Sequence, residues 1–241
     1  MKNRYCLLIL LALIAFMPAR AERFFDNGTP DRLLTFGVQV GATSSGMKAD
    51  VPAYGDNATF SWKGGFTVGA TVDLNVRNFF TIQPGFFYES HNYKYSLIEH
   101  NPLEQSLRTD LGNACAKTFS IPVLLSFRFN LTRNLRWNVD VGPYFQFGLG
   151  GNDEVTQIYV KNGNAEQEGA YVSNTAKRDY YGDGDWQHRS FDWGAKVGTG
   201  LCLFDHYTFN IHYQRGFRNV SANKAWSMHS KSCLVTFGYL F

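Results

Sequence analysis

The last stretch of the chain, from Lys231 to Phe241, constrains the fold more than any other. Counting back in twos from the end gives an unbroken apolar row made of Phe241, Tyr239, Phe237, Val235 and Cys233. The positions between them carry small and polar residues as well as leucine. This is the two-residue period of a β-strand with one strongly apolar face. We expect that face to contact hydrocarbon.

A final Phe preceded by aromatic residues at alternate positions resembles the closing strand of bacterial outer-membrane barrels. The resemblance implies that the barrel-assembly machinery recognises Val235, Phe237, Tyr239 and Phe241 during insertion into the membrane. The alternative is an ordinary edge strand of a soluble sandwich that happens to end in Phe.

The first 21 residues have the form of a signal peptide. A basic start is followed by an apolar run from Tyr5 to Met17, and Ala19 and Ala21 are small residues at the positions that a signal peptidase recognises. The run is too short to cross a bilayer as a helix. Cys6 lies at the start of the apolar run and not after it, which argues against a lipoprotein. We predict cleavage after Ala21, so that residues 22–241 form the mature domain.

Charge argues against nucleic acid as a partner. Removing Lys2, Arg4 and Arg20 from the 23 basic residues leaves 20, which equals the 20 acidic residues, all beyond the signal peptide. The mature chain is therefore neutral when His is neutral, and the main sequence support for nucleic-acid binding is lost.

Cysteine usage indicates neither a disulfide framework nor a zinc site. Cys115, Cys202 and Cys233 remain in the mature chain, an odd number without metal-ligand spacing. Whether two of them form a disulfide is left open. We expect no cofactor.

Beyond residue 21 no apolar stretch is long enough for a membrane helix, so a membrane protein of this sequence must be a closed barrel. Eight segments show the two-residue period: 34–43, 66–76, 80–89, 119–129, 135–147, 191–203, 207–214 and 231–241. A tilted strand needs roughly 9 to 11 residues to cross a bilayer, which these segments approach. Pro84 counts slightly against a regular ladder in its segment.

The connections between these segments alternate in length. The long ones are 44–63, 91–116, 150–189 and 218–230, and the short ones lie near Asn78, Asn134 and Asp205. Outer-membrane barrels have short periplasmic turns and long outer loops. We therefore predict an all-β, eight-stranded antiparallel up-and-down barrel in the bacterial outer membrane, surrounded by lipid, with both termini in the periplasm. Residues 155–160 alternate and are expected to extend a hairpin above the membrane. A soluble lipocalin-like barrel is the alternative, but it turns its apolar row inward.

The rows opposite the apolar ones carry charges of both signs. They are Asp73, Glu89, Arg128, Arg136, Asp140, Asp192 and Lys196. An eight-stranded barrel is just wide enough for side chains to fill it. Buried charges must be paired, so we expect a salt-bridged lumen without a general diffusion pore. A narrow or gated ion path is the alternative.

Two groups of residues are candidates for chemistry, one for lipid hydrolysis and one for calcium binding, and neither has the pattern that its chemistry requires. His188, Ser190 and Asp192 have the spacing of a His-x-Ser pair found in some outer-membrane lipid hydrolases, but they share parity with the lumen row. The aspartates of residues 179–185 supply oxygen ligands for calcium, but their spacing does not fit an EF-hand and Gly-Asp runs are common in loops. We expect neither an enzyme nor a metal site.

Several motifs resemble those of PorT-like outer-membrane barrels. They are Thr81–Tyr88, Ser120–Leu125, Val141–Tyr144, Phe191–Gly194 and Tyr213–Val220. The similarity extends from about Phe36 to Phe241 and includes the prolines at 84, 122 and 143. The name-giving member is needed for type IX secretion, whereas most relatives have no assigned activity. The resemblance implies no catalytic residues.

Three functions follow in order of preference. The first is an accessory or structural barrel that assists protein secretion, with secretion-system proteins as partners. The second is a narrow or gated transport channel. The third is an outer-membrane lipid hydrolase.

Overall fold

The computed structural model describes residues 24–52, 54–101, 106–161 and 171–241, so the predicted signal peptide lies outside the described residues. These residues form strands β1 (Leu34–Asp50), β2 (Ala58–Arg77), β3 (Phe80–Asn101), β4 (Ser106–Thr132), β5 (Leu135–Lys161), β6 (Tyr171–Asp179), β7 (Phe191–Leu203), β8 (Tyr207–Gly216) and β9 (Ser227–Leu240), with a 3₁₀ turn η1 (Gly55–Asn57). No helix in the described ranges is long and apolar enough to cross a membrane.

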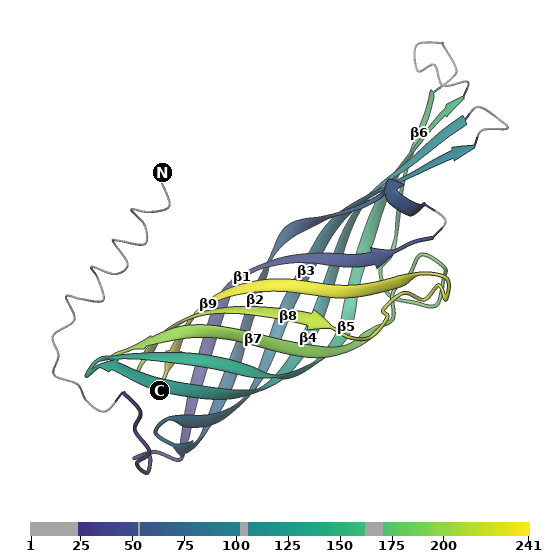
Figure 1. The fold of residues 1–241 in the computed structure, drawn as a ribbon. Coiled ribbons are helices and arrows are strands. Elements are labelled where there is room, and N and C mark those ends of the chain that lie inside the picture. Colours follow the sequence, from purple (N-terminus) through teal and green to yellow (C-terminus); the bar gives the residue numbers. More distant parts are fainter. Residues whose placement is uncertain (1–23, 53, 102–105, 162–170) are drawn as a thin grey trace, which may run out of the picture.

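Eight of these strands close into an antiparallel ring (Figure 1). Its order is β1-β2-β3-β4-β5-β7-β8-β9, and β9 returns to β1 through pairs that run from Gly37 with Leu240 to Asp50 with Ser227. β6 pairs with the upper part of β5, outside the ring. The predicted eight-stranded fold is confirmed.

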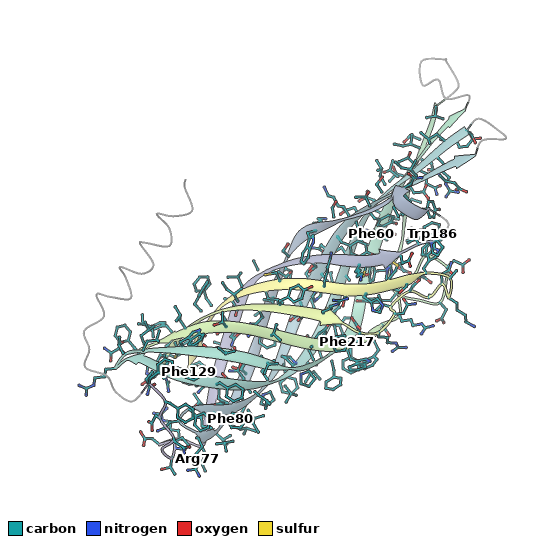
Figure 2. The ribbon with its side chains drawn as sticks, in the orientation of Figure 1. Phe60, Arg77, Phe80, Phe129, Trp186 and Phe217 are labelled. Carbon is teal, nitrogen blue, oxygen red and sulfur yellow. The ribbon has the colours of Figure 1, made fainter. Side chains whose placement is uncertain are left out.

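The outside of the ring carries the apolar rows. Phe36, Phe237 and Phe241 are each more than half exposed, while Thr71 and Asp73 on the opposite row are buried. Figure 2 shows Phe80 and Phe129 near the short-turn end of the molecule, and Phe60 and Trp186 near the other end, where they pack against a buried apolar cluster. Exposed apolar area of this extent marks an interaction surface, here one suited to hydrocarbon.

β1, β2, β3 and β4 run well beyond their predicted segments, and most of the two predicted loops 44–63 and 91–116 is strand. The prediction was wrong because it followed the outward apolar row, which ends at the edge of the lipid band. Above the membrane the outward row faces water and can be polar, as at exposed Lys94, while Tyr93, Tyr95 and Leu97 on the inward row are buried. The extension predicted for 155–160 is correct, because β5 continues to Lys161 and pairs with β6.

This end of the molecule contains an apolar core outside the lipid band. Tyr93, Tyr95, Tyr180, Val220 and Met228 are among its buried members. They come from β3, from β9 and from the loops that precede β7 and β9. Beyond this core β3, β4, β5 and β6 continue as a projecting sheet (Figure 1).

At the opposite end the turns are short and the segment before β1 lies against them. Phe24 stacks on Phe129 with ring centroids 5.0 Å apart, and the Asn130 amide donates to the Phe24 carbonyl at 3.0 Å. The Asn78 amide donates to the Gly28 carbonyl at 3.2 Å. This segment has no regular secondary structure and is fixed to two turns.

The ladder is interrupted beside a proline. Pro84 pairs with Val123, but the next paired residues are Phe87 and Ser120. Pro122 lies in the part of β4 that is skipped. Because proline has no backbone N–H to donate, it is tolerated where pairing lapses. The expectation that Pro84 disturbs a regular ladder is correct.

Candidate functional site

The centre of the lumen is organised around Glu89, whose side chain is fully buried. Its Oε2 atom accepts from His91 Nε2 at 2.8 Å and from Gln214 Nε2 at 3.2 Å. Lys196 Nζ lies 3.9 Å from the other carboxylate oxygen and 5.2 Å from the centroid of the Phe87 ring. Three strands, β3, β7 and β8, thus meet at one buried acid, because each turns its polar row inward.

Two further acids in the lumen have partners of their own. Asp73 forms an ion pair with Arg128 and accepts from Gln83 Nε2 at 2.6 Å. Asp140 accepts from Asn138 Nδ2 at 2.7 Å and from His212 Nε2 at 3.1 Å. Each carboxylate is almost fully buried, so these partners replace the water that the charge has lost.

The structure does not join all seven predicted lumen charges. Arg136 lies at the short-turn mouth, where it pairs with the exposed Asp205 of the β7–β8 turn at 2.8 Å. Asp192 lies near the other end of the barrel and accepts from Ser230 Oγ and from the Trp193 amide. Asp73, Glu89, Arg128, Asp140 and Lys196 therefore form the inner set, and the other two close the ends.

The space left between these groups is small. A cavity of about 10 Å³ lies beside Lys196 and His212, and one of about 20 Å³ lies between Arg128 and Arg136. A single water needs at least about 10 to 15 Å³. A wider cavity of about 320 Å³ opens at the short-turn mouth, where Arg32 is among the lining residues. The described lumen thus consists of water-sized spaces behind one open vestibule.

Several partners in this network are not among the residues predicted from the sequence. His212 and Gln214 stand on the polar row of a predicted strand, but neutral side chains were not included among the candidates. His91 was assigned to a loop, although it continues the inward row of Glu89 by two residues. Continuing the inward row beyond Glu89 in steps of two residues identifies His91 as a lumen residue.

An aromatic cap covers the lumen at the long-loop end of the barrel. The ring of His188 stacks on Tyr180 with centroids 4.3 Å apart, and its Nε2 atom lies 3.1 Å from the Tyr93 hydroxyl. This loop lies outside the membrane-spanning segments. Burial lowers the pKa of the His188 imidazole to about 4, so the ring is neutral at physiological pH.

The residues considered for a hydrolase do not form a catalytic array. His188 bonds to Tyr93, Asp192 bonds to Ser230, and Ser190 is exposed. No hydrogen bond joins Ser190 to either of the other two within the described residues. All three border a cavity of about 50 Å³, which has room for little more than water.

The aspartates considered for calcium and the three cysteines form no shared cluster in the described part of the chain. Asp183 and Asp185 are exposed, and no group of three or more His, Cys, Asp or Glu side chains converges there. Cys115, Cys202 and Cys233 are free thiols.

The terminal row lies on the outer surface of the barrel. Phe237, Tyr239 and Phe241 on and after β9 are exposed, and Val235 shares their side. Tyr239 stacks on His206 with centroids 5.3 Å apart. Recognition of this row by assembly machinery stays a prediction.

Comparison with known families decides the class. The family described as "Outer membrane protein beta-barrel domain" matches residues 21–222. The chain belongs to this family. It is an integral β-barrel protein of the bacterial outer membrane. No curated protein matches the sequence.

Three solved structures are distantly similar to the chain. Ail of Yersinia pestis, in complex with the heparin analogue sucrose octasulfate, is 11% identical, with 87% of this chain and 100% of that chain covered and a TM-score of 0.42. OprG of Pseudomonas aeruginosa is 11% identical, with coverage of 90% and 99% and a TM-score of 0.38. Neisserial surface protein A is 11% identical, with coverage of 85% and 96% and a TM-score of 0.37. Values this low add nothing to the assignment, which rests on the family match.

Proposed function

We propose that the protein is a closed outer-membrane barrel with an accessory role, carried by the strand extension beyond the lipid band and not by conduction. The observation that carries this proposal is the filled lumen. Glu89, Asp73 and Asp140 are buried, and the spaces beside Lys196, His212 and Asn138 are of water size. Arg128, the partner of Asp73, also borders the open vestibule at the short-turn mouth.

A permeating ion would have to displace these buried pairs. Separating a buried carboxylate from its partner costs about 3 to 5 kcal/mol, because the remaining charge has no water around it. Selective pores instead offer a row of groups that bind an ion weakly enough to release it. The lumen therefore favours a structural plug over the narrow or gated channel.

The long-loop end is proposed to face the outside, with the short turns and both termini in the periplasm. The difference in connection length supports this orientation, because outer-membrane barrels place their short turns in the periplasm. In a background without native cysteines, Asp183→Cys on intact cells should react with a membrane-impermeant maleimide. Arg133→Cys, in the β4–β5 turn, should react only after the outer membrane is opened. The reverse pattern would refute the orientation.

The extension is the part of the protein best placed to meet a partner. β3, β4, β5 and β6 project beyond the ring, and most side chains of β6 are exposed. Motifs such as Tyr213–Val220 resemble PorT-like barrels, and this resemblance supports secretion-system proteins as partners and a role in type IX-like secretion.

A deletion of the gene tests this role through the distribution of secreted proteins. If the proposal holds, proteins normally released to the medium accumulate in the periplasm. Complementation with a barrel that lacks residues 159–172, cut at the paired Ile158 and Ser173, should fail to restore release. Arg77→Gln, at the opposite end, is the matched control and should restore it. Unchanged secretion in the deletion strain would refute the secretion role.

The lipid-hydrolase alternative has a simple test. Ser190→Ala should leave the lipid profile of the complemented strain unchanged, since Ser190 has no hydrogen bond to His188. A profile that changes with this substitution would revive the enzyme hypothesis.

A further inference from the structure

Two cationic side chains stand opposite each other on the outer surface of the barrel. Arg215 of β8 pairs directly with Lys231 of β9. Arg215 is exposed and shares its side of the strand with Ile211 and Tyr213, which belong to the apolar band. Directly opposed side chains have Cβ atoms about 5 Å apart, and like charges in that position are destabilising. This arrangement requires an explanation.

No acid on the neighbouring strands neutralises the pair. Ala195 of β7 lies beside Arg215, and Gly46 of β1 lies beside Lys231, so the row across four strands contains two cations and no carboxylate. The ion pairs within the described residues include neither cation. The nearest aspartate along β7, Asp192, is buried and bonded to Ser230.

Further positive charge lies on the next outward row. Exposed Lys48 pairs with His229, one step from the Arg215–Lys231 row. Lys231 Nζ also lies 5.1 Å from the centroid of the Trp62 ring. We name Arg215, Lys231, Lys48 and Trp62 the cationic patch.

The patch lies at the edge of the lipid band. On the row below it Tyr213 pairs with Cys233, one step of about 7 Å along the strands. Phe217, labelled in Figure 2, is exposed on the other side of Arg215 and packs edge-on against Trp193 at 5.4 Å. Aromatic rings on both sides of Arg215 are typical of the level at which tryptophan and tyrosine meet lipid headgroups.

We propose that the cationic patch binds the phosphate group of an outer-leaflet lipid. A guanidinium donates two parallel hydrogen bonds to phosphate oxygens, and an ammonium adds a third donor as a point charge. The bound anion converts the repulsion between Arg215 and Lys231 into attraction to a shared partner. The flanking rings favour a lipid over a soluble acidic protein, because they hold the phosphate beside acyl chains. Only the choice of leaflet rests on the orientation proposed above.

Native mass spectrometry of the whole mature protein in neutral detergent tests the proposal. The probes are lipid A, the same lipid after dephosphorylation, and inorganic phosphate. We expect the wild type to retain phosphorylated lipid A, and the double variant Arg215→Gln with Lys231→Gln to lose at least about tenfold in affinity. Lys224→Gln, at an exposed loop lysine, is the charge-matched control and should bind as the wild type does.

The charge reversal Lys231→Glu separates lipid binding from simple surface repulsion. It gives Arg215 a cross-strand partner of opposite sign, so the thermal midpoint without lipid should not fall. The rise in midpoint that lipid A produces in the wild type should disappear. Equal binding by the double variant, or by dephosphorylated lipid, would overturn the proposal. An equal midpoint rise with inorganic phosphate alone would assign the patch to free anions instead. These results do not depend on any role in secretion.

Discussion

Arg128→Met removes the partner of a fully buried acid. Asp73 has no exposed side-chain surface and relies on Arg128 and on Gln83 Nε2 at 2.6 Å. Methionine keeps most of the length of the side chain and removes its charge. Breaking a buried pair in this way costs about 3 to 5 kcal/mol, because the remaining carboxylate is left in a place that water does not reach.

Arg136→Met is the matched control on the neighbouring strand. Arg136 pairs with Asp205, whose side chain is 66% exposed. Exposed pairs contribute about 0 to 1 kcal/mol, because water solvates both charges. The two substitutions should therefore differ by at least about 2 kcal/mol in unfolding free energy.

Urea unfolding of the purified barrel, refolded into lipid vesicles, measures that difference. Adding Asp73→Asn to Arg128→Met should recover part of the loss, because the orphaned charge is gone. If Arg128→Met unfolds at the same urea concentration as Arg136→Met, the lumen pair is solvated and our description of the plug is wrong.

Two further predictions concern the cap and the extension. The folded pKa of His188 is about 4 against about 6.5 when unfolded, so its contribution of about 3 kcal/mol is complete above pH 6.5 and is lost as pH falls toward 4. Urea midpoints between pH 7 and pH 4 should fall less steeply in His188→Gln, and an identical slope would contradict this. A Cβ at Gly112 would lie 2.0 Å from the Tyr95 ring. Gly112→Ala should thus lower stability by about 1 to 3 kcal/mol, as measured by urea unfolding, and Tyr95→Ala in the same chain should remove that difference.

The sequence predicts the ring because period and composition agree. Each transmembrane strand has bulky residues on one row and Gly, Thr or charged residues on the other, as at Phe237 and Thr236. In a barrel this fixes which side meets lipid, since a slip of one residue would reverse every side chain. Short turns such as the one at Asn78 then determine that consecutive strands pair with each other.

The extension and the network were less accessible to the same argument. Beyond the band the apolar row is the inward one, as at Tyr93 and Tyr95, whereas within the band it is the outward one, as at Phe86. A search for one continuous apolar row therefore ends at the edge of the band. Parity also says which residues face inward but not which strands stand opposite across the lumen. The contact of Gln214 with Glu89 depends on the closure of the ring, which strand order alone does not give.

Single-channel recording in a planar bilayer tests the central claim, that the barrel is closed, most directly. We predict no discrete conductance steps for the purified wild type, because Glu89, Lys196 and their neighbours fill the lumen. Lys196→Met reports whether any observed current passes through the barrel. Reproducible steps in the wild type, altered in size by Lys196→Met, would show an ion path through the lumen and would contradict the account.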